Sequence, residues 1–73
     1  MLKSYRVTSA FYAKQLYREP GQYGNFGQGD LLVALRIVGD QIEFCRQDKP
    51  RDEGGKLEYT ITESDLSRHS EEV

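Results

Sequence analysis

Near its start the chain alternates apolar and polar side chains. The apolar positions of one parity are Tyr5, Val7, Phe11 and Ala13. A period of two is typical of a strand with one buried face, so we predict a strand over residues 3–13. A helix beginning at Thr8 or Ser9 is the alternative, because the residues from Ala10 to Leu16 tolerate helical structure well.

The longest apolar run extends from Leu31 to Val38 and predicts a central strand. Gly39 and Asp40 separate this run from a second alternating segment, residues 41–47. A glycine-first pair between two such runs is the signature of a tight hairpin, because glycine reaches positive φ at no steric cost. We therefore predict that the two segments form a hairpin.

Glycine dominates the segment between these strands. It occupies four of the positions in residues 18–30, namely Gly21, Gly24, Gly27 and Gly29. Such a density of glycine, next to a Pro-Gly pair, indicates a turn-rich loop. We predict a long loop here with no regular element.

The last third of the chain predicts a further strand and a short helix. A charged turn at residues 48–55 precedes Leu57, Tyr59 and Ile61, which alternate with polar residues. Thr62 then precedes an acidic stretch, a pattern that favours the start of a helix of one or two turns. We expect residues 70–73 to fray.

The order of these elements resembles the SH3-like small-barrel family over most of the chain, with Gly29-Asp30 ahead of the long strand as its local motif. The resemblance implies a mainly β fold, either a small SH3-like barrel or a strongly bent antiparallel sheet with a short C-terminal helical turn. Peptide-binding SH3 domains use paired tryptophans, and this chain has none. Recognition of proline-rich peptides is therefore not implied.

Length and composition limit the organisation of the protein. A chain of 73 residues has room for one core, so we expect residues 1–73 to form a single domain. The single cysteine, Cys45, cannot form an internal disulfide, which favours a reducing, cytoplasmic location. The absence of a long apolar segment predicts a soluble protein outside the membrane. Exposed strand edges allow either a monomer or a homodimer.

The candidate chemical groups do not form a recognisable active site. Cys45 and His69, with Asp65 one helical turn away, are the nearest approach to a catalytic set, but they lie in a strand and a chain end. One cysteine and one histidine fall short of the four ligands of structural zinc. The glycine-rich segment opens a strand and lacks the lysine and hydroxyl of a phosphate-binding loop. We therefore expect no enzymatic activity, no metal and no cofactor.

Charge and aromatic residues are unevenly distributed. Residues 1–38 carry five basic and two acidic side chains, whereas residues 39–73 carry five basic and ten acidic ones. The basic part also holds six of the eight aromatic residues. Tyrosine and arginine dominate protein-contact hot spots, and the predicted contact residues are Tyr12, Lys14, Tyr17, Arg18, Tyr23 and Phe26.

These residues lead to one functional hypothesis and three alternatives. The hypothesis is a non-catalytic binding or regulatory module that engages a protein partner. The same residues suit stacking on a single-stranded nucleic acid, and the acidic second half suits a small inhibitor that mimics an acidic ligand. The third alternative is that Tyr23 and Phe26 fold back and close one end of the barrel.

Overall fold

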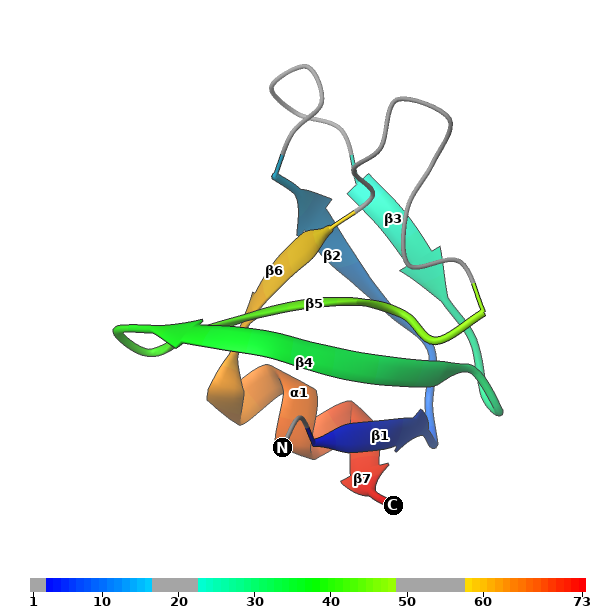
Figure 1. Cartoon of the computed structure of the whole chain (residues 1–73). Coiled ribbons are helices and arrows are strands. Elements are labelled where there is room, and N and C mark those ends of the chain that lie inside the picture. Colours follow the sequence, from blue (N-terminus) through cyan, green and yellow to red (C-terminus); the bar gives the residue numbers. More distant parts are fainter. Residues whose placement is uncertain (1–2, 17–22, 49–57) are drawn as a thin grey trace.

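The computed structural model describes residues 3–16, 23–48 and 58–73 (Figure 1). These residues form seven strands and one short helix. The elements are β1 (Ser4–Val7), β2 (Phe11–Gln15), β3 (Tyr23–Phe26), β4 (Leu31–Val38), β5 (Gln41–Arg46), β6 (Tyr59–Thr62), α1 (Glu63–His69) and β7 (Ser70–Glu72).

The strands form one antiparallel sheet in the order β3-β2-β6-β5-β4-β1-β7. Figure 1 shows the sheet curling into a half-barrel, with β4 and β5 crossing below β2, β3 and β6, and with α1 beneath them. The prediction of a mainly β fold with a strongly bent sheet and a short C-terminal helix is confirmed. The closer likeness to SH3-like barrels stays a prediction.

Aromatic rings fill the concave side of the curled sheet. Phe26 stacks on Phe11 with ring centroids 5.1 Å apart and meets the edge of Tyr59 at 4.8 Å. Phe44 packs against both Phe26 and Tyr59 at 5.3 and 5.7 Å. Leu66 of α1 is fully buried in the same cluster. The helix therefore contributes to the core that the strands enclose.

The predicted hairpin is confirmed. β4 and β5 pair over their whole length, and Gly39 in the turn has φ of 64°, where a side chain would be strained. The register shifts between Ala34 and Arg36, as in a β-bulge, which bends the strand. Beyond this shift Ile37 and Val38 are exposed.

The first alternating segment is extended, as predicted, but it forms two strands. The chain turns between β1 and β2, where the backbone N–H groups of Thr8 and Ser9 donate to the carbonyl of His69 at 2.8 and 3.2 Å. As a result, β1 pairs with β4 and β7, whereas β2 pairs with β3 and β6. The helical alternative is wrong at these residues.

The prediction of a loop without regular structure in residues 18–30 is also wrong, because β3 lies within that segment. Glycine is needed at one position of this strand. A Cβ on Gly24 would lie 2.9 Å from Cζ of Tyr59 and closer still to its Cε2, so the buried ring occupies the place of a side chain. The ring of Tyr59 thus packs directly on the backbone of β3 and stabilises a strand that its own sequence disfavours.

The predicted C-terminal helix is confirmed, and the prediction that residues 70–73 fray is wrong. Thr62 caps α1 by accepting a hydrogen bond from the N–H of Asp65 at 3.2 Å. Residues 70–72 form β7 and pair with β1, and the N–H of Val73 donates to Ser4 at 2.9 Å. Long-range pairing with β1 therefore orders a polar segment that sequence alone predicts to fray.

No helix in residues 3–16, 23–48 or 58–73 has the length and apolar character needed to cross a bilayer.

Candidate binding face and groove

The paired strands β2 and β3 separate alternate side chains onto two faces. Phe11, Ala13 and Phe26 point to the core and are buried. The residues between them point outward, because successive side chains in a strand lie on opposite sides. We call the resulting surface the outer face, and its members are Tyr12, Lys14, Tyr23 and Asn25.

The register brings the four residues of the outer face together. Tyr12 lies opposite Asn25, and Lys14 lies opposite Tyr23. Directly opposite side chains in an antiparallel pair have Cβ atoms about 5 Å apart, and diagonal neighbours are within reach of long side chains. Tyr12 is 71% exposed and Tyr23 is 60% exposed. The two tyrosines and the lysine therefore form one continuous, accessible surface.

Lys14 differs from the other cations in the described part of the chain. Each of the others lies within 4 Å of a carboxylate, and the pairs are Lys3 with Glu72, Arg6 with Glu71, Arg36 with Glu58, Arg46 with Asp30 and Arg68 with Asp65. Lys14 has no acidic partner among these residues. Its positive charge is therefore available to a binding partner.

Three of the predicted contact residues thus meet on the outer face. Phe26 does not join them, because it is 2% exposed and lies at the opposite parity to Tyr23, so its placement in a contact surface needs correction. Tyr17 and Arg18 fall outside the described residues. The sequence does not predict Asn25 as a member of this face, because its glycine-rich surroundings do not predict the strand that positions it.

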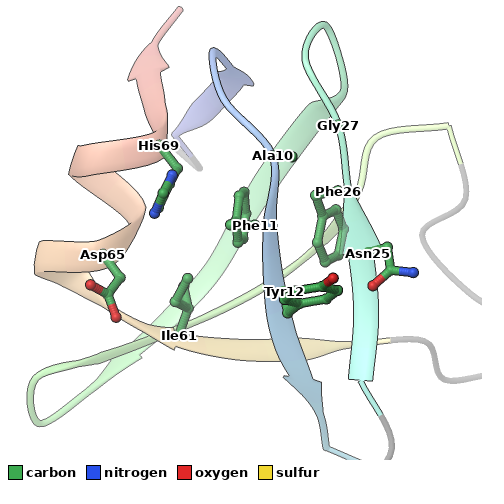
Figure 2. Close-up of a pocket in the computed structure, with 9 residues that line it drawn as sticks. All are labelled: Ala10, Phe11, Tyr12, Asn25, Phe26, Gly27, Ile61, Asp65 and His69. Atoms are coloured by element: carbon green, nitrogen blue, oxygen red, sulfur yellow. The ribbon is translucent and has the colours of Figure 1, made fainter.

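A groove lies beside the outer face, between β2 and α1. It is an open depression of about 680 Å³. Figure 2 shows Phe11, Ile61, Asp65 and His69 on the side of β2 that faces α1, and Tyr12 on the side that faces β3. Asn25, Phe26 and Gly27 contribute to the lining from β3 and its end. β2 pairs with β6 at Lys14 and Gln15, the end of β2 away from α1, and the groove lies at the other end of the strand. No sequence pattern predicts it.

Cys45, Asp65 and His69, the nearest approach to a catalytic set in the sequence, make separate contacts in the structure. His69 Nδ1 lies 2.9 Å from the hydroxyl of Ser9, and its ring stacks on Phe11 at 5.6 Å, so it fastens the β1–β2 connection to α1. Asp65 lies 3.5 Å from Arg68 on the same helix. Cys45 is buried on β5. Within the described ranges, no three metal-ligating side chains gather around a common point.

Arg46 and Asp30 fasten β3 to the rest of the sheet. The carboxylate of Asp30 accepts hydrogen bonds from the N–H of Gly27 at 2.9 Å and from Arg46 at 3.0 Å. The guanidinium of Arg46 also lies 4.3 Å from the ring centre of Phe26 and donates to the carbonyl of Asn25. The Gly27 N–H, with help from Arg46, holds the pKa of Asp30 below its usual value of 3.8. The position of the outer face therefore depends on a charged clamp at its edge.

Comparison with known proteins gives no relative from which a role could be transferred. The chain matches no protein-family model, and searches among curated proteins and solved structures gave no match.

Proposed function

We propose that the protein is a non-catalytic binding module that engages a protein partner through the outer face of β2 and β3. One observation carries the proposal: Tyr12 and Tyr23 are exposed on the same side of one strand pair as Lys14, the cation that has no carboxylate partner among the described residues. Tyrosine offers a large contact area with few rotatable bonds, so ordering it at an interface costs little entropy.

The strands hold this surface ready for contact. The backbone of β2 is paired with β3 from Phe11 to Lys14 and with β6 at Lys14 and Gln15, and Phe11 and Phe26 anchor β2 and β3 in the core. A rigid support lowers the cost of binding, because fewer groups must be ordered in the complex.

A protein is a better match than a single-stranded nucleic acid. Two exposed rings suit base stacking, but binding of a strand also needs several cations that neutralise phosphates. Among the described residues, every lysine and arginine except Lys14 lies within ion-pair distance of a carboxylate. Lys14 alone among them would be free to neutralise a phosphate. The acidic-mimic hypothesis has similar difficulty, because Asp65, Glu71 and Glu72 each face a cation.

Affinity capture from the native lysate tests the proposal. The wild-type chain should retain a protein partner, and the double variant Tyr12→Ala, Tyr23→Ala should lose it while its circular dichroism spectrum stays unchanged. Ile37→Ala is the matched control, because Ile37 is 66% exposed and lies on the β4–β5 hairpin rather than on the outer face. This control should bind like the wild type.

Nuclease treatment of the lysate separates the alternatives. Capture that survives nuclease and depends on the two tyrosines supports a protein partner. Capture that disappears with nuclease and weakens steeply with salt would assign the outer face to nucleic acid instead. Equal capture by the wild type and the tyrosine variant would refute the proposal.

A further inference from the structure

The register of β2 and β6 indicates which backbone groups of β2 face the groove. β2 and β6 pair at Lys14 with Thr60, and beyond that pair the N–H of Leu16 donates to Glu58 at 3.0 Å. In the other direction the same register would place Tyr12 opposite Thr62, but the ladder ends before that pair. The N–H and C=O of Tyr12, which point to the same side of β2 as those of Lys14, are left without a ladder partner on β6.

The sequence of β6 explains why the ladder stops. Thr62 caps α1 with its hydroxyl, and the next residue, Glu63, donates its N–H to the carbonyl of Asp40 at 2.9 Å. The chain thus turns from β6 into α1 directly after Thr62, the residue that would lie opposite Tyr12. In Figure 2 the helix lies alongside the first half of β2, with the groove between them.

The side chains of the groove complement these free backbone groups. Phe11 and Ile61 provide an apolar base, with 7% and 9% of their surfaces still exposed. A peptide in extended conformation can hydrogen-bond to a strand edge while every second side chain points to one side. One such segment would hydrogen-bond to the backbone N–H and C=O of Tyr12 and place an apolar side chain against Phe11 and Ile61.

A helical segment, whose backbone hydrogen bonds are internal, fits the groove less well. A bound helix would cover the N–H and C=O of Tyr12 without pairing them, and burying such groups unpaired costs free energy. The charge of the occupant follows from Lys14, which lies two residues along β2 from Tyr12 and lacks a carboxylate partner in the described ranges. An acidic side chain on the segment would supply that partner.

We propose that the groove between β2 and α1 binds an extended segment of a protein partner, which pairs with the backbone of Tyr12 and presents a carboxylate to Lys14. The inference rests on the proposed function and states how the partner is held. It adds the groove to the outer face, with Tyr12 common to both, because Tyr12 lines the groove and its ring lies on that face.

Selection from a library of short random peptides tests this mode of binding. The wild-type chain is the target, and Ala10→Trp is the counter-target, because Ala10 is exposed and lines the groove, where an indole would fill the space. Amide spectra check that the variant keeps the fold. Peptides enriched on the wild type should contain an acidic residue and should shift the amide resonance of Tyr12.

Synthetic versions of an enriched peptide then test backbone pairing directly. N-methylation of the amide that pairs with β2 should weaken binding roughly tenfold, the effect of about one lost hydrogen bond, whereas N-methylation of the next amide, which points away, should not. This comparison uses the unaltered protein and remains decisive if Ala10→Trp fails to fold. Lys14→Glu should weaken binding of the acidic peptide and restore it for a version in which lysine replaces the acid.

Two results would overturn the inference. One is that no peptide is enriched on the wild type, and the other is that N-methylation has the same effect on both sides of the peptide. Loss of capture in the tyrosine variant together with either result would leave the proposed function standing and remove only the strand-pairing mode. Selective loss at the groove-facing amide supports both the groove and the extended conformation.

Discussion

The two faces of the β2–β3 pair differ more than the compositions of the two strands suggest. Phe11 and Tyr12 are neighbours in sequence, yet 7% of the first and 71% of the second is exposed. On β3, Phe26 is buried and Tyr23 is exposed. Burial of an aromatic residue is here decided by its parity within the strand. The inner face stabilises the fold, and the outer face is free to bind.

Truncation of the inner face should have the largest effect. Phe26→Ala removes a ring that contacts Phe11, Phe44 and Tyr59 and that supports the guanidinium of Arg46. We expect a loss of about 3–5 kcal/mol in the free energy of unfolding, measured by urea denaturation, because a large buried cavity would result. A loss below about 1 kcal/mol would show that Phe26 is not a central core residue.

Gly24→Ala should have the next largest effect. The added methyl group would overlap the ring of Tyr59, which is 3% exposed and has little room to move. We expect a loss of about 1–3 kcal/mol in the same measurement, as for overpacking of a core. Gly27→Ala is the matched control, because a Cβ there meets no atom within 4 Å and should change stability little. Equal effects of the two substitutions would contradict the packing of Tyr59 on β3.

Asp30→Asn should weaken the clamp at the edge of β3 in a pH-dependent way. The pKa of Asp30 is lowered in the folded protein, so its contribution to stability is present above the unfolded value of roughly 4 and is lost as the pH falls through the folded value. We expect the variant to be less stable by about 1 kcal/mol at neutral pH, since the carboxylate accepts charge-assisted hydrogen bonds but is partly exposed. Urea denaturation across the acid range should show the wild type and variant converging below pH 4 or so. A difference that does not change with pH would exclude the charge of Asp30 as its cause.

Substitution of the outer face should have the smallest effect on stability. Tyr12→Ala and Tyr23→Ala should each change the free energy of unfolding by less than about 0.5 kcal/mol, because neither ring contributes to the core. Thermal unfolding followed by circular dichroism measures this directly. A large loss for either variant would place that tyrosine among the residues that stabilise the fold and would remove the distinction between the two faces.

Sequence was sufficient where the relevant interactions are local. The β4–β5 hairpin follows from two alternating runs joined by Gly39-Asp40, and α1 follows from Thr62 ahead of acidic residues. β3 could not be predicted in this way, because its glycines disfavour a strand and the ring that supports it, Tyr59, lies far along the chain. β7 likewise depends on pairing with β1, at the other end of the sequence.

The candidate site shows the same division. Aromatic and basic composition predicts Tyr12, Lys14 and Tyr23 as contact residues, and the structure places them on one face. The same composition predicts Phe26, but without the strand β3 it carries no information on which side of the strand a side chain lies. The groove depends on the point at which β6 leaves the sheet, and Arg46 reaches β3 from a separate hairpin. Neither the groove nor the contact of Arg46 with β3 can be predicted from the neighbouring residues in sequence.

The pairing of β1 with β7 has a consequence for how the protein folds. Arg6 and Glu71, which face each other in this pair, are separated by 65 positions, whereas the two strands of the hairpin are joined by a turn. Closing so long a loop has an entropic cost that the three residues of β7 offset with few contacts, so we expect this edge of the sheet to form after the β4–β5 hairpin and to open before it. Amide hydrogens of β7 should then exchange with solvent well before those of β4 and β5.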